Sequence, residues 1–245
     1  PVAHQARKVS PAAITSARPT IPHIASLPAA RAASSMPAPR AARACARLVV
    51  EDEILRADIS RIAAAVHAAR DLVNTPTEDL GPEQMETVIA TLAATHGAEL
   101  RCFVGDELLQ HNFPAIHAVG RASHRAPRLI ELTWGDPQHP RIAILGKGVC
   151  FDTGGLNIKA GDGMAAMKKD MGGAAVAIQL AQLVMSAGLP VHLQLLVAAV
   201  ENAIGPNAYR PGEVIGTRAG LSVENCDFSN FTGAGAVVFS GVTTI

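Results

Sequence analysis

One glycine-rich part of the chain, residues 146–170, holds two lysines and two aspartates whose combined spacing could support chemistry. They are Lys147, Asp152, Lys159 and Asp170, at successive spacings of five, seven and eleven residues. Carboxylate oxygens are ligands that divalent cations favour, and a lysine amine becomes a ligand once it has lost its proton. Glycines let the backbone pass close to a bound ligand. Together, these residues indicate a centre for a divalent cation with one amine among its ligands.

Each of these residues also has a structural explanation when it is taken alone. Asp170 falls at or near the N-cap of a predicted helix at 171–187, where the helix dipole favours a carboxylate. Asp152 can serve in a turn, and Lys147 as the partner of an acidic residue. Cys150 lies between two apolar residues and is expected in the core rather than as a nucleophile. Only the combination of lysines and aspartates favours the metal centre.

The candidate residues lie inside a predicted strand–helix–strand unit. Strands at 141–145 and 191–200 enclose the helix at 171–187, which is apolar on nearly all sides and must be buried. Such a unit implies parallel strands covered by helices, and ligands bind beyond the carboxyl ends of parallel strands. Glu201 and Asn202 follow the second strand, so we expect them either beside the site or in the turn that ends the strand.

The rest of the chain supplies further elements of an α/β domain. Apolar residues at helical spacing predict helices over 52–72 and 82–96, and Pro76 stops the first of them. Short apolar runs predict strands over 99–104 and 128–134. We therefore expect an α/β fold with a parallel-rich central sheet that is flanked by helices on both faces.

The stretch 146–159 reads GKGVCFDTGGLNIK and is followed by MKKDMGGAA at 167–175. Both motifs resemble the leucyl aminopeptidase family, the cytosol aminopeptidases that use two metal ions. Three shorter phrases support the resemblance: DLVNTP at 71–76, AVEN at 199–202 and YRPGE at 209–213. The likeness extends roughly over residues 70–224 and implies an incomplete catalytic domain that releases N-terminal, leucine-like residues from peptides.

The resemblance also implies a role for each matching residue. Lys147 and Asp170 match ligands of one metal site, and Asp152 matches the carboxylate that bridges both metals. Lys159 matches the catalytic lysine that polarises the scissile carbonyl, while Met167 and Asp170 match positions at the substrate. The implied cofactors are two divalent cations, Mn²⁺ or Zn²⁺, and the implied chemistry is two-metal hydrolysis.

The chain departs from the family after residue 224. The family continues into Asn-Thr-Asp-Ala-Glu-Gly-Arg, whose acidic residues are metal ligands and whose arginine holds a bicarbonate that acts as general base. This chain reads NCDFSNF at 225–231, so a two-residue deletion would make Asp227 a candidate ligand. Ser229 and Phe231 would then replace the glutamate and the arginine. We expect one retained cation, a lost bicarbonate site and impaired hydrolysis through truncation; the alternative is an inactive metal-binding or assembly remnant.

Composition divides the chain into three segments. Residues 1–47 are rich in alanine, proline and arginine, contain no acidic residue and are expected to form a disordered leader. We expect a partial catalytic domain over 48–224 and a divergent tail over 225–245. The expected location is the cytoplasm, or an organelle if 1–47 is a transit peptide. The family assembles as homo-hexamers, which the missing second half of the domain puts in doubt for this chain.

Several other classes of protein are excluded by composition. Residues 1–50 hold seven basic and no acidic residues, which leaves 14 basic and 21 acidic residues in the rest, a net charge of −7. The net negative charge of residues 51–245 argues against nucleic-acid binding. No apolar run is long enough for a membrane span. Four scattered cysteines form neither a zinc cluster nor a disulfide framework. The histidines of a polar loop, His111, His117 and His124, are expected to be solvated rather than ligands.

Overall fold

The computed structural model describes residues 49–211, residue 213 and the backbone of residues 236–240. It divides into two units, Pro1–Ile59 and Ser60–Ile245. Of the first unit, residues 49–59 are described, and they open helix α1 (Glu53–Asn74). Asp52 Oδ1 caps this helix, because it accepts the N–H groups of Ile54 and Leu55 at 2.8 and 3.0 Å. The leader expected at 1–47 lies outside the described residues.

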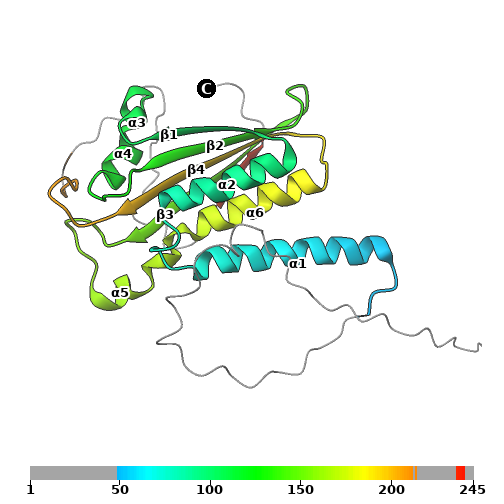
Figure 1. The fold of residues 1–245 in the computed structure, drawn as a ribbon, viewed down its shortest axis with the longest axis horizontal. Coiled ribbons are helices and arrows are strands. Elements are labelled where there is room, and N and C mark those ends of the chain that lie inside the picture. The colour runs from blue at the N-terminus through cyan, green and yellow to red at the C-terminus, as the bar shows by residue number, and fades with distance from the viewer. Residues whose placement is uncertain (1–48, 212, 214–235, 241–245) are drawn as a thin grey trace, which may run out of the picture. The chain divides into compact units, whose positions relative to one another are not determined.

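The second unit is built on a five-stranded sheet with the strand order β1-β2-β4-β3-β5 (Figure 1). Only β3 and β4 run parallel, and the other three neighbouring pairs are antiparallel. The expected α/β class is confirmed, but the sheet is mixed rather than mainly parallel. A parallel neighbour needs a long crossover, whereas the short link 135–140 simply reverses the chain between β2 and β3. The strands are β1 (Glu99–Val104), β2 (Arg128–Trp134), β3 (Arg141–Asp152), β4 (His192–Asn202) and β5 (Ala236–Ser240).

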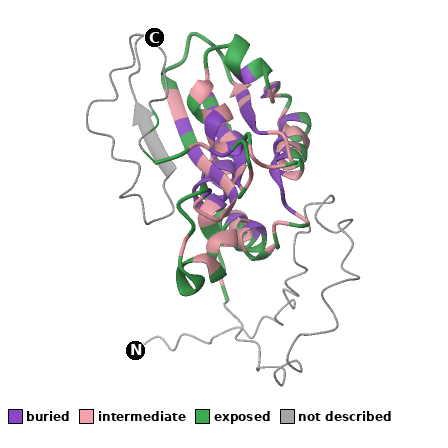
Figure 2. Cartoon of the chain, turned by 90° about the vertical axis from the view of Figure 1, so that its left-hand side faces the viewer, coloured by how far each residue is buried: buried purple, intermediate pink, exposed green. Residues whose placement is uncertain are grey.

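Helices cover both faces of the sheet, as expected. Helices α2 (Pro82–His96) and α6 (Gly172–Ser186) pack on one face, over side chains that alternate along the strands. The short helices α3 (Glu107–Gln110) and α4 (Pro114–Gly120) form a smaller core with β1, β2 and β4 on the other face. Figure 2 shows that buried residues concentrate in the sheet and the helices against it. The main core residues on the α2–α6 face are Ile130, Leu132, Ile144, Leu193, Leu195 and Val197.

Helix α6 approaches β3 closely because the facing residues are small. A Cβ added to Gly146 would lie 2.7 Å from Ala174 Cα and 2.9 Å from Ala177 Cβ, distances that real Cβ atoms do not show. Both alanines are fully buried. This contact sets the 3₁₀ turn η2 (Met167–Met171), which precedes α6, against β3. It thereby brings Asp170 to the strand that carries Lys147.

Most predicted elements agree with the structure, and two differ at the candidate site. Strand β3 continues to Asp152 instead of ending at residue 145, so its glycines stand in a strand and not in a loop. Helix α6 begins at Gly172, which leaves Asp170 in the turn η2. Asp170 does not cap α6, because its side chain accepts a hydrogen bond from Lys147 instead. The turn η2 follows the short helix α5 (Gly161–Ala165) and leads directly into α6.

The segment between β1 and β2 also differs from the expected polar loop. His111 follows α3, and His117 lies within α4, where its Nε2 is 3.2 Å from Asp106 Oδ1. His124 is exposed, as expected.

The described residues contain no cluster of three His, Cys, Asp or Glu side chains suited to a metal. Among those same residues, no helix combines the length and apolarity needed to span a membrane.

Candidate metal centre

The four chemically promising residues form two ion pairs along the second half of β3 and just beyond it. Lys147 Nζ lies 2.9 Å from Asp170 Oδ1, and Lys159 Nζ lies 3.0 Å from Asp152 Oδ2. The aspartates are mostly buried, with side chains 17% and 16% exposed, while about a third of each lysine side chain is exposed. Two ion pairs thus bring together residues that are up to 23 positions apart in the sequence.

Asp152 is held by three donors. Its Oδ1 accepts the Gly154 N–H at 2.9 Å and the Asn202 side-chain amide at 2.7 Å, while Oδ2 accepts from Lys159. Burial acts to raise the pKa of Asp152, but these hydrogen bonds outweigh it and the pKa is lowered. The carboxylate is therefore ionised and fixed in orientation at neutral pH.

Asp170 is held less completely. Its Oδ1 accepts from Lys147, but its buried Oδ2 has no hydrogen-bond partner among the described residues. Burial raises the pKa of Asp170, and the nearby Lys147 only partly opposes the effect. A buried acceptor without a partner is unusual in folded proteins. A divalent cation beside Oδ2 would supply the missing partner, so this donor set fits a metal.

A tight loop after β3 returns Lys159 to Asp152. Gly154 and Gly155 have φ angles of +87° and +60°, which L side chains rarely adopt. A Cβ on Gly154 would lie 2.2 Å from Asn157 O, so only glycine fits there. The carbonyl of Thr153 accepts the Lys159 N–H at 2.9 Å, which closes the loop.

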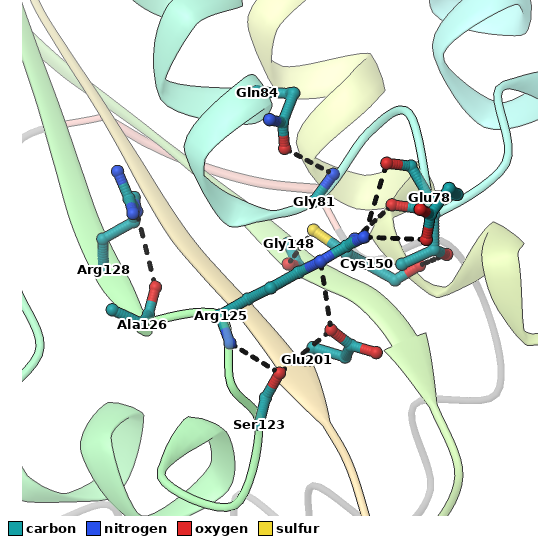
Figure 3. A network of polar contacts seen from close by, with 11 residues as sticks. Glu78, Gly81, Gln84, Ser123, Arg125, Ala126, Arg128, Gly148, Cys150 and Glu201 are labelled. Atoms are coloured by element: carbon teal, nitrogen blue, oxygen red, sulfur yellow. Dashed lines mark hydrogen bonds and ion pairs between the residues drawn. The ribbon is translucent and has the colours of Figure 1, made fainter.

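A second polar network braces the ends of β3 and β4 (Figure 3). Arg125 bonds the Thr77 carbonyl, lies 3.1 Å from Glu78 Oε2 and 3.9 Å from Glu201 Oε2. Ser123 Oγ donates to the same oxygen of Glu201 at 3.0 Å. Glu201 therefore belongs to this brace, whereas Asn202 contacts the metal-centre residue Asp152.

The brace also reaches an irregularity in β3. Pairing with β4 shifts between Val149 and Phe151, so Cys150 forms a bulge, and Thr77 Oγ1 donates to its carbonyl at 2.7 Å. Cys150 is 1% exposed, and burial raises the pKa of its thiol to about 12. This confirms its core position and leaves it almost no thiolate at neutral pH. Arg125 and Thr77 carried no motif by which sequence reasoning would have found them.

The remaining predicted residues are less well placed. Met167 is half-buried and opens the turn η2, close in sequence to Asp170, and its role at the substrate stays a prediction. Asp227, Ser229 and Phe231 lie outside the described residues. A metal held by the described residues would therefore need the amine of Lys147 beside the two carboxylates.

The model for the catalytic domain of the cytosol aminopeptidase family matches residues 67–230, well over half of the chain. The chain belongs to the cytosol aminopeptidase family. It is 41% identical over 175 residues to a probable cytosol aminopeptidase of Wolinella succinogenes, covering 70% of this chain and 36% of that protein. It is 40% identical over 162 residues to peptidase B of Pectobacterium atrosepticum, covering 63% and 37%.

Solved structures of cytosol aminopeptidases share the fold. The enzyme from Coxiella burnetii is 47% identical with a TM-score of 0.66, covering 68% of this chain and 36% of that one. The bottromycin maturation enzyme BotP, solved in complex with Mn, is 35% identical with a TM-score of 0.65, covering 69% and 37%. This member of the cytosol aminopeptidase family thus spans little more than a third of the length of these relatives.

Proposed function

We propose that this chain forms the metal centre of an aminopeptidase that releases N-terminal, leucine-like residues from peptides by two-metal hydrolysis. One observation carries the proposal: a buried oxygen of Asp170 lacks a partner in a Lys147–Asp170 pair that lies within electrostatic range of the Lys159–Asp152 pair. Membership of the cytosol aminopeptidase family supports it. The Mn complex of BotP supports manganese as one candidate cation, with zinc as the other.

Lys147, Asp152 and Asp170 are the residues that would hold a cation. When bound, divalent cations supply Lewis acidity toward a peptide carbonyl and lower the pKa of water. Lys147 Nζ must lose its proton to act as a ligand. While Lys147 is protonated, its Nζ donates a hydrogen bond to Asp170 Oδ1 at 2.9 Å.

Lys159 is the residue that we assign to catalysis. Its ammonium group pairs with Asp152 Oδ2 at 3.0 Å, and about a third of its side chain is exposed. Lys159 would donate a hydrogen bond from its ammonium group to the scissile carbonyl oxygen and stabilise the negative charge that develops there. The loop through Gly154 and Gly155 fixes its direction of approach.

The finer points of the proposal concern substrate, partners and location. Met167 is assigned to the pocket for the first side chain of the peptide, and Asp227 to the second cation. We propose peptide substrates, a hexamer as in the family, no nucleic acid, no membrane, and a cytoplasmic location. The alternative is an organellar location, if 1–47 is a transit peptide. We also propose that 48–224 is the catalytic segment and 225–245 a divergent tail.

A second candidate function is an inactive metal-binding or assembly remnant. A two-residue deletion would favour it, because Ser229 and Phe231 would then stand where the family has a metal-binding glutamate and the arginine of the bicarbonate site. The two functions differ in metal stoichiometry. A working two-metal enzyme binds about two cations per chain, and a remnant at most one.

Hydrolysis of a leucine anilide by the purified chain with added Mn²⁺ tests the proposal. We expect turnover that falls at least about a hundredfold in Lys159→Ala, the typical effect of losing one group that stabilises developing charge. Lys169→Ala is the matched control, because Lys169 is exposed in η2, and should retain turnover. A folded, metal-loaded chain without turnover would contradict the aminopeptidase and favour the remnant.

A further inference from the structure

Asn202 is the last residue of β4, and its side chain is buried against Asp152. The residue is 8% exposed, and its Nδ2 donates to Asp152 Oδ1 at 2.7 Å. Its backbone is fixed as well, since its carbonyl accepts the Thr153 N–H at 3.0 Å and the Thr153 hydroxyl at 2.7 Å. Three hydrogen bonds therefore join the end of β4 to residues 152 and 153 of β3 and its loop.

The bulge in β3 creates this pairing. Val149 pairs with Val200, and after the bulge Phe151 pairs with Glu201 and Asp152 with Asn202. In a regular strand, Phe151 would stand opposite Asn202, and Asp152 one residue beyond it. β-bulges commonly redirect a side chain beside a functional site. Here the bulge is held by Thr77, through the carbonyl of Cys150.

The loop after β3 leaves room for the Asn202 side chain. A Cβ added to Gly155 would lie 3.1 Å from Asn202 Oδ1, closer than most real contacts, and the φ of Gly155 is +60°. The backbone thus passes directly over the amide group. Both the strand register and the glycine in the loop are needed to bring this amide to Asp152.

The consequence is that the two oxygens of Asp152 become unequal. Oδ1 accepts two N–H groups, from Asn202 and Gly154, which occupy both of its lone-pair positions. Among the residues that the structure describes, Oδ2 accepts only from Lys159, so it keeps one position for a cation. We propose that Asn202 is a positioning residue that locks Asp152 with Oδ2 directed to the metal centre. This inference rests on the proposed metal-binding function.

Metal affinity separates positioning from a purely structural role. Calorimetric titration of the full chain with MnCl₂ should show binding about 10–100-fold weaker in Asn202→Ala and in Asn202→Leu, the usual effect of losing a partner of a metal ligand. Asn202→Leu keeps the volume of the side chain while removing its donor. Asn157→Ala is the matched control, because Asn157 is exposed in the same loop, and its affinity should stay within about twofold of the original.

Each outcome decides the inference. Unchanged Mn²⁺ affinity in the folded Asn202 variants would overturn it while leaving the proposed function intact. No Mn²⁺ binding by the unaltered chain would overturn the proposed metal centre itself. Melting temperatures measured in EDTA report folding, and loss of folding in both variants would assign Asn202 to the stability of the β4 end and contradict a positioning role.

Discussion

Replacing Asp170 with asparagine should raise the dissociation constant for Mn²⁺ at least about a hundredfold, or about 2.7 kcal/mol. Asparagine keeps the shape of the side chain but removes the negative charge beside Lys147 and the buried Oδ2 that lacks a partner. The folded, metal-free chain should tolerate the change. Burial raises the pKa of Asp170, so at neutral pH the folded state holds its charged form at a cost that asparagine removes.

Calorimetry and thermal melting measure the two parts of this expectation. Mn²⁺ should raise the melting temperature of the unaltered chain and leave that of Asp170→Asn almost unchanged. Asp162→Asn removes a neighbouring carboxylate that is exposed on α5, and it should behave as the unaltered chain does. Equal Mn²⁺ affinity in Asp170→Asn and Asp162→Asn would remove Asp170 from the metal centre.

Replacing Arg125 with methionine should lower the free energy of unfolding by about 3 kcal/mol. The guanidinium joins the Thr77 carbonyl to two acidic residues, Glu78 and Glu201, and its side chain is only 21% exposed. Methionine leaves the half-buried Glu201 with Ser123 as its remaining donor. The stability of Arg125→Lys should fall between those of the unaltered chain and Arg125→Met, because one ammonium group cannot span three acceptors on two segments.

Urea denaturation in EDTA measures this effect without a contribution from metal binding. Arg141→Met is the control, because Arg141 is exposed at the start of β3, and should change stability by less than about 0.5 kcal/mol. A second consequence follows from the contact between Thr77 and the Cys150 carbonyl. Because that contact holds the bulge, the folded Arg125→Met chain should also bind Mn²⁺ more weakly. Stability equal to that of Arg141→Met would contradict the brace.

Much of the fold could be predicted from local sequence patterns. Helix α2 and strands β1 and β2 have the predicted bounds, because periodic apolar residues and flanking turn residues specify such elements locally. The full length of β3 could not be predicted. Gly146 and Gly148 are typical of a loop, and they fit a strand here because α6 and β4 lie too close for any side chain.

The chemistry of the site was likewise predictable only in part. The spacing of Lys147, Asp152, Lys159 and Asp170 predicts a metal centre, and the structure joins the four residues in two ion pairs. The supporting contacts depend on residues that are remote in the sequence. Arg125 meets Thr77 across 48 positions, and Asn202 meets Asp152 across 50. Such pairs arise from strand order and from the bulge, neither of which has a local signal.

Anomalous diffraction from a crystal of the full chain grown with Mn²⁺ tests the central claim most directly. The account predicts a manganese peak between Lys147 Nζ, Asp152 Oδ2 and Asp170 Oδ2, at coordination distances of about 2.0–2.3 Å. Asp152 Oδ1 should remain bonded to Asn202 and Gly154. Manganese bound elsewhere, or a Lys147–Asp170 ion pair that persists unchanged in saturating Mn²⁺, would contradict the metal centre.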